Sequence, residues 1–209
     1  MHRRACLQWG LQGAVSLLIG AGLESAQAGA QQEEALSDAV RQVLASAIAD
    51  RKPPWAAAEH AAGRDTGHRP WLQAADRALA RHMAASHIRE EFLETLSYEA
   101  TRAGLEKALV LGLIQVESAF RKYAISTSGA RGYMQVMPFW MRLIGDGRES
   151  QLFHTQTNLR FGCVILRHYL QFEQGDLMLA LGRYNGSRGQ MPYATAVLAA
   201  RRQWQEAGA

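Results

Sequence analysis

The stretch from Leu105 to Ala119 constrains the fold more than any other part of the chain. Apolar residues occur on almost every side of its helical repeat, at positions 109, 111, 113, 114 and 116. A helix that is apolar all round is typically buried at the centre of a protein. Alternation of apolar and polar residues, the pattern of a half-buried strand, occurs nowhere over a useful length. The sequence therefore predicts an all-α protein built around this helix.

Seven further segments show a helical spacing of apolar residues. Gly104 provides a C-terminal cap for the segment before the central helix, and Asp176 provides an N-terminal cap for a later one. Between the first two segments, residues 51–70 contain Pro53 and Pro54, which predicts an irregular linker. The additional helices are predicted at residues 34–48, 71–84, 87–103, 133–144, 155–172, 177–184 and 193–205.

The first thirty residues have the pattern of a secretory signal. Two arginines precede an uncharged apolar run from Leu11 to Leu23, and small residues follow it up to Ala28. This predicts a signal peptide over residues 1–28, with a second possible cut after Ala30. The alternative is an uncleaved anchor, although the 13-residue run is shorter than a helix needs to span a bilayer of about 30 Å. We therefore expect a periplasmic protein without stable membrane insertion after cleavage.

Cysteine usage and charge exclude several classes of protein. Cys6 lies in the predicted signal, so Cys163 would be left alone and no internal disulfide could form. The formal net charge of +4 is compatible with an anionic partner, but no compact cluster of Lys and Arg indicates nucleic acid. The sequence also lacks zinc, calcium and phosphate-binding motifs. We expect no metal, no cofactor and no nucleic acid.

One carboxyl group stands out near the end of the central apolar helix. Glu117 follows Ile114 and Val116, and Ser118 comes directly after it. Burial disfavours the charged form of a carboxyl group and raises its pKa. A carboxylic acid with a raised pKa can donate a proton near neutral pH, as glycoside cleavage requires. The alternative is an ordinary glutamate that reaches solvent at the end of a helix.

Three short motifs follow one another in the order found in a known family. They are Glu117-Ser118, the Gly-Tyr-Met-Gln of residues 132–135, and the Arg-Tyr-Asn of residues 183–185. With them, residues from about 90 to 200 resemble the catalytic domain of the soluble type of lytic transglycosylase (SLT), in the goose-type lysozyme superfamily. The helix between the last two motifs resembles that family at Asn158, Gly162, Leu166 and Tyr169.

The resemblance implies a fold and a domain organisation. It implies a lysozyme-like catalytic domain over residues 87–209, preceded at 29–86 by a helical N-terminal extension with the irregular linker. Two positions depart from the family pattern: Tyr133 stands where Leu is usual, and Arg183 where Ala is usual. Neither departure removes a catalytic group.

The resemblance also implies an activity on peptidoglycan glycan strands. Such enzymes cleave the β-1,4 bond between N-acetylmuramic acid and N-acetylglucosamine and form 1,6-anhydromuramic ends. Glu117 would first protonate the leaving oxygen and then accept the proton of the attacking 6-hydroxyl, so one carboxyl group suffices. Two alternatives stay open, a hydrolytic goose-type muramidase and a peptidoglycan-binding assembly factor with little turnover.

The motif match extends to the residues around Glu117. We expect Tyr184 to hydrogen-bond Glu117 and keep it oriented, and the alternative is that it is an aromatic residue of the core. Gln135 and Ser118 offer hydrogen bonds to the substrate, although Ser118 can instead bond the backbone of its own helix.

Three further residues are assigned to the substrate groove. Met134 is expected to line the groove, because Met makes adaptable apolar contacts, and the alternative is that it fills part of the core. Tyr133 would make this part of the groove more polar than Leu does. Asn185 is either a substrate contact or a helix cap.

Overall fold

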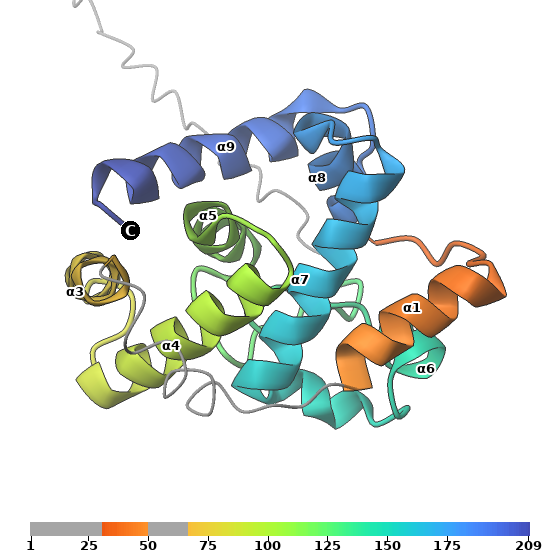
Figure 1. Ribbon diagram of the computed structural model, residues 1–209, viewed down its shortest axis with the longest axis horizontal. Coiled ribbons are helices and arrows are strands. Elements are labelled where there is room, and N and C mark those ends of the chain that lie inside the picture. The colour runs from red at the N-terminus through yellow and green to blue at the C-terminus, as the bar shows by residue number, and fades with distance from the viewer. Residues whose placement is uncertain (1–30, 50–66) are drawn as a thin grey trace, which may run out of the picture.

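The computed structural model describes residues 31–49 and 67–209, and these residues form helices and connecting loops (Figure 1). Within the described ranges the extended pairing is limited to isolated bridges at Arg131, and the prediction of an all-α protein is confirmed. The predicted signal peptide and most of the predicted linker lie outside the described residues. The helices are α1 (Asp38–Ala49), α3 (His68–Leu79), α4 (Ser86–Arg102), α5 (Lys107–Ser118), α6 (Phe139–Ile144), the 3₁₀ helix η1 (Glu149–Phe153), α7 (Thr155–Phe172), α8 (Leu177–Asn185) and α9 (Met191–Glu206).

Helix α5 lies at the centre, as its apolar composition predicts. Its side chains from Ala108 to Ile114 are buried, and α9 packs along it more extensively than any other helix does. Figure 1 shows α9 running over α5, with α4 and α7 on the opposite side. An apolar helix thus finds a helical partner on each of its faces, which removes its surface from water.

Helix α7 packs against several other helices of the described structure. It spans the predicted residues Thr155–Phe172 and packs on α4, α8 and η1. Cys163 is buried on this helix, and burial raises the pKa of its thiol. Cys163 is therefore a packing residue, as expected for a free cysteine.

The helices of the N-terminal part pack on the rest of the fold at two places. Helix α1 contacts α6 and α7, and α3 lies against α4. The buried carboxylate of Glu99 on α4 pairs with Arg160 on α7 at 2.9 Å. Arg102 of α4 donates to the carbonyl of Ala47 in α1. Buried ion pairs of this kind fix relative positions when both charges are satisfied. The predicted domain boundary at residue 87 falls one residue after α4 begins.

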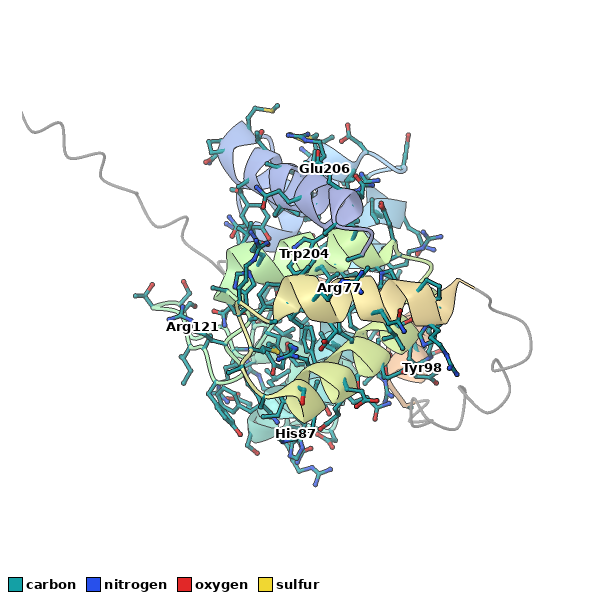
Figure 2. The ribbon with its side chains drawn as sticks, turned by 90° about the vertical axis from the view of Figure 1, so that its left-hand side faces the viewer. Arg77, His87, Tyr98, Arg121, Trp204 and Glu206 are labelled. Atoms are coloured by element: carbon teal, nitrogen blue, oxygen red, sulfur yellow. The ribbon has the colours of Figure 1, made fainter. Side chains whose placement is uncertain are left out.

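Helix α3 closes one side of the molecule. Figure 2 shows it between α4 and the end of α9 that carries Trp204, and Arg77 of α3 is exposed. The ring of His82, just after α3, packs against Phe120 and Trp204. None of the helices in the described ranges is both long and apolar enough to cross a membrane.

Four segments differ from the sequence prediction. The helix predicted at 71–84 runs instead from His68 to Leu79, and the helix predicted from residue 34 begins at Asp38. The predicted helix 133–144 is helical only from Phe139, because the residues before Pro138 form a tight loop. Residues Glu149–Phe153, for which no helix is predicted, form the 3₁₀ helix η1. There the Glu149 carboxylate pairs with Arg131 at 3.1 Å and with Arg142 at 2.9 Å, which organises the turn.

Candidate active site

Glu117 lies one residue before the end of α5, where the helix stops abruptly. The next two residues past the helix, Ala119 and Phe120, both have positive φ angles of 48° and 62°, a conformation that is costly for residues other than glycine. The ring of Phe120 is buried edge-on against Phe92 and Trp204. This packing holds the strained turn in place, so the chain leaves the helix directly after Glu117.

The carboxyl group of Glu117 is almost completely buried, with 4% of the residue exposed. The Tyr193 hydroxyl donates a hydrogen bond to Oε1. The second oxygen, Oε2, is also buried and has no hydrogen-bond partner in the part of the chain that the structure describes. Burial raises the pKa of Glu117 from 4.5 to about 8, although the hydrogen bond from Tyr193 opposes this rise. Glu117 is therefore mainly protonated near neutral pH.

The close packing of α5 and α9 brings Tyr193 to Glu117. A Cβ atom added to Gly112 of α5 would lie only 2.6 Å from the backbone nitrogen of Arg201 and 3.0 Å from the carbonyl of Val197, both on α9. Only glycine allows the two backbones to approach so closely. Tyr193 lies in the first turn of α9, so the helix crossing at Gly112 determines how its hydroxyl faces Glu117.

Residues 124–137, hereafter the motif loop, contain the second sequence motif and are held by α7. The Asn158 side chain accepts from the Met134 backbone nitrogen and donates to the carbonyls of Arg131 and Leu152, each at 2.8 Å. Gly132, with φ of +77°, passes so close that an added Cβ would lie 2.4 Å from Asn158 Nδ2. These contacts explain why Asn158 and the motif loop occur together in the family pattern.

The structure corrects the predicted role of Tyr184. Its hydroxyl donates to the backbone carbonyl of Met134 at 2.8 Å, and the hydrogen bond to Glu117 comes instead from Tyr193. Tyr184 is completely buried beneath the motif loop, close enough for the Glu117 charge to raise its pKa. It therefore supports the loop next to the carboxyl group, while Tyr193 makes the direct contact.

Two polar residues that were predicted to contact substrate donate hydrogen bonds to backbone carbonyls of the protein instead. Ser118 donates to the Ile114 carbonyl at 3.2 Å, which is the alternative considered for it, and is 1% exposed. Gln135 has a positive φ of 47°, and its amide donates to the carbonyls of Ala124 and Gly132 at 3.1 and 2.9 Å. Both side chains thus stabilise the backbone around the site.

The expected groove residues Met134 and Tyr133 are also inside. Met134 is fully buried, and a Cβ atom on Gly162 would lie 2.3 Å from its sulfur, so Gly162 makes the space that Met134 fills. The prediction that the Met134 side chain lines the groove is therefore wrong. Tyr133 is 2% exposed and packs on Phe92 at 4.8 Å between ring centroids, so it adds to the core and not to the polarity of a groove.

The side-chain oxygen of Asn185 has no hydrogen-bond partner among the described residues. It is the last residue of α8, and Gly186 in a left-handed conformation caps the helix after it. Its amide nitrogen donates to the Ser187 hydroxyl at 3.1 Å, whereas Oδ1 is buried without a partner among the described residues. A buried carbonyl oxygen with no partner is costly unless a ligand or water satisfies it, which fits the prediction of a substrate contact.

Other carboxylates stand apart from Glu117. Its pKa is shifted by burial and by Tyr193, and no second carboxyl group of the described chain contributes to that shift. Asp146 pairs with Arg148 at 2.6 Å, and Glu149 with two other arginines. Nor do His, Cys, Asp and Glu side chains of the described ranges gather into a group that could hold a metal ion. Unlike the buried carboxylate of Glu99, which pairs with Arg160, the Glu117 carboxyl group has no ion-pair partner among the described residues.

The family model described as the transglycosylase SLT domain matches residues 94–203, more than half of the chain. The chain belongs to this family. The matched range begins within α4 and ends within α9, so it includes both Glu117 and Tyr193. The resemblance predicted from the three motifs is confirmed.

Curated relatives carry the name membrane-bound lytic murein transglycosylase C. One, from Actinobacillus pleuropneumoniae serotype 5b (strain L20), is 43% identical over 99 residues, which cover 42% of this chain and 27% of the relative. Another, from Histophilus somni (strain 2336), is 34% identical over 95 residues, with 40% and 26% covered. The chain thus spans about a quarter of the length of the relatives it matches.

Two solved structures are also similar to this chain. The lytic transglycosylase Slt of Pseudomonas aeruginosa, solved as an inactive mutant, has 21% identity and a TM-score of 0.43 over 85% of this chain and 36% of its own. The 70 kDa soluble lytic transglycosylase of Escherichia coli has 14% identity and a TM-score of 0.48, with 86% and 38% covered. The family assignment rests on the sequence match.

Proposed function

We propose that this protein is a peptidoglycan lytic transglycosylase with Glu117 as its catalytic acid and base. The observation that supports this most is the environment of the Glu117 carboxyl group, which is buried, has its pKa raised to about 8 by that burial, and is bonded through only one oxygen among the described residues. A neutral carboxylic acid can protonate the oxygen of a glycosidic bond as that bond breaks. The unpartnered Oε2 is the atom free to meet the substrate.

The second half of the reaction uses the same group. After the bond breaks, the Glu117 carboxylate accepts the proton of the muramic 6-hydroxyl, which attacks its own anomeric carbon and closes the 1,6-anhydro ring. An intramolecular nucleophile gains the entropic advantage of proximity. Hydrolytic glycosidases generally use two carboxyl groups about 5–9.5 Å apart, whereas among the described residues no second carboxyl group contributes to the pKa shift of Glu117. This favours transglycosylation over hydrolysis.

Tyr193 and Asn185 complete the proposed site. The Tyr193 hydroxyl fixes the orientation of the carboxyl group and stabilises its charged form between the two proton transfers. The unpartnered Oδ1 of Asn185 accepts a hydrogen bond from a sugar hydroxyl or an acetamido N–H group. Gln135, Ser118, Met134 and Tyr133 shape the backbone and packing around them.

The proposed substrate places the protein in the cell envelope. Its relatives are named as membrane-bound enzymes of murein, and the N-terminal pattern of this chain predicts export to the periplasm. Intact-mass measurement on fractionated cells tests this proposal: the periplasmic form is expected to begin near Gly29 or Gln31.

Digestion of purified peptidoglycan by the wild type and by Glu117→Gln tests the function. The amide keeps the shape of the side chain but can transfer no proton, so the release of soluble fragments is expected to fall by about 10²–10⁴-fold. Mass spectrometry of the wild-type products should show muramic ends that lack one water. Hydrolysed ends would assign the protein as a muramidase, and near wild-type release by Glu117→Gln would remove Glu117 from the mechanism.

A further inference from the structure

Residues 31–37, hereafter the strap, lead into α1 and reach the back of the candidate site. Most of the strap is exposed, but Gln31 is only 4% exposed. A buried amide is costly unless its polar atoms find partners. The contacts of Gln31 therefore show which parts of the fold the strap is attached to.

The Gln31 side chain joins separate parts of the site. Its Oε1 accepts a hydrogen bond from Trp140 Nε1 of α6 at 3.0 Å and a longer one from the Met137 backbone nitrogen at 3.5 Å. The Gln31 side chain also lies near the Tyr184 hydroxyl of α8 and partly offsets the rise in the pKa of that phenol that burial causes, although its Nε2 has no hydrogen-bond partner among the described residues. One amide from the N-terminal part thus bonds α6 and the end of the motif loop, next to Tyr184 of α8.

Tyr184 connects this amide to the chemistry. Its hydroxyl supports the Met134 carbonyl within the motif loop at 2.8 Å. The same side chain lies within the electrostatic reach of both Glu117 and Tyr193. A change in the position of the Tyr184 hydroxyl therefore alters both the loop and the environment of the carboxyl group.

A surface ion pair holds the strap a few residues further on. Arg183 donates to the carboxylates of Glu34 in the strap and of Glu173 in the loop after α7. Its guanidinium group also lies over the Phe172 ring, 4.4 Å from the centroid. Arg183 is the residue that replaces the usual Ala of the third motif, so this departure from the family pattern gives the strap its second attachment.

We propose that Gln31 is a positioning residue of the active site, which holds Trp140 and the end of the motif loop, beside Tyr184, in the arrangement that Glu117 needs. The proposal rests on the proposed function of Glu117. Gln31 acts through Trp140 and the motif loop and does not touch the substrate. Its loss should slow the chemical step more than it weakens substrate binding.

Kinetics of full-length variants on soluble glycan strands test the role of Gln31. Gln31→Met keeps the length of the side chain without its hydrogen bonds, and Trp140→Phe keeps an aromatic side chain, smaller than indole, without its donor. Each is expected to lower kcat about 2- to 10-fold with KM within about twofold, as the loss of one hydrogen bond predicts. Because both remove the same contact, the double variant should be no slower than the slower single variant.

Two additional variants separate positioning from mere stability. Gln32 is the exposed neighbour in the strap, so Gln32→Met is the matched control and should keep wild-type kcat. The carboxyl group that Gln31→Glu introduces is neutral at acidic pH, and it then accepts and donates hydrogen bonds as the amide does. At acidic pH this variant should therefore keep the kcat of the wild type. As the pH rises and the new carboxyl group ionises, its kcat should fall below that of the wild type.

The outcomes distinguish this proposal from the proposed function. If Glu117→Gln is inactive while Gln31→Met keeps wild-type kcat, only the positioning role fails. Additive losses in the double variant, or a loss of activity that matches the fraction unfolded by circular dichroism, would also overturn it. If Glu117→Gln stays active, the proposed function itself fails, whatever Gln31 does.

Discussion

The α5–α9 pair and the motif loop meet at the candidate site, and they use their polar groups in opposite ways. Around the motif loop, the side chains of Asn158 on α7 and of Gln135 within the loop satisfy several backbone groups. In the helix pair, Glu117 keeps one buried oxygen without a partner in the described structure. Satisfied networks are rigid, whereas an unpaired buried group is kept at a cost and is available to a ligand. A family motif can therefore mark the scaffold as well as the chemistry.

The largest difference between the two regions should appear when one hydroxyl is removed from each. Tyr193→Phe deletes the hydrogen bond to Glu117, and the loss of a bond to a charged group costs about 1.5–3 kcal/mol, or roughly 10- to 100-fold in kcat. The fold should be retained, because the ring stays in place. Initial rates of fragment release, compared with the circular dichroism of the same sample, measure the effect. A variant as fast as the wild type would reduce Tyr193 to a packing residue.

A smaller effect is expected when the two helices are pushed apart. In Gly112→Ala the new Cβ would clash with the Arg201 backbone at 2.6 Å, and overpacking of this kind costs about 1–3 kcal/mol of unfolding free energy. Since Tyr193 moves with α9, activity should fall with stability, by about tenfold or less. Urea unfolding and rate measurements test both effects. Alanine favours a helix over glycine by about 1 kcal/mol, so a more stable and fully active variant would show that the close crossing is not needed.

The smallest effect on catalysis is expected in the scaffold. Tyr184→Phe leaves the Met134 carbonyl without its donor, which should lower the unfolding free energy by about 1–3 kcal/mol. The rate should fall less than in Tyr193→Phe, by about 2- to 10-fold. Thermal unfolding and rates of the two Phe variants, measured side by side, make the comparison. A larger loss of activity in Tyr184→Phe would reverse the roles assigned to the two tyrosines.

Much of the fold could be predicted from local sequence patterns. The all-α class, the bounds of α7 and the N-cap of α8, where Asp176 accepts from the Leu179 nitrogen at 3.0 Å, follow from periodicity and capping residues. Glu117 could be singled out because a carboxyl group in an apolar helix is unusual. The short helices were harder: η1 depends on the ion pairs of Glu149, which periodicity does not reveal.

The partners within the site could not be predicted in the same way. Tyr193 contacts Glu117 across 76 positions of sequence, and Gln31 contacts Trp140 across 109. Neither Tyr193 nor Gln31 belongs to one of the three motifs. Their contacts depend on how α9 crosses α5 and where the strap ends, which are properties of tertiary packing. The third motif predicted that its tyrosine, Tyr184, bonds Glu117. The residue that does so is also a tyrosine, but it is Tyr193 of the next helix, α9.

The central claim is that Glu117 is a buried acid that keeps its proton near neutral pH. Nuclear magnetic resonance with ¹³C-labelled glutamate carboxyl groups measures this directly, and the Glu117→Gln spectrum identifies the signal. The account predicts that Glu117 titrates with a pKa of about 8, and that wild-type kcat falls as the pH rises through that value and the acid loses its proton. A Glu117 signal that titrates near the ordinary value of 4.5 would contradict the account, because the group would then be a carboxylate with no proton to donate.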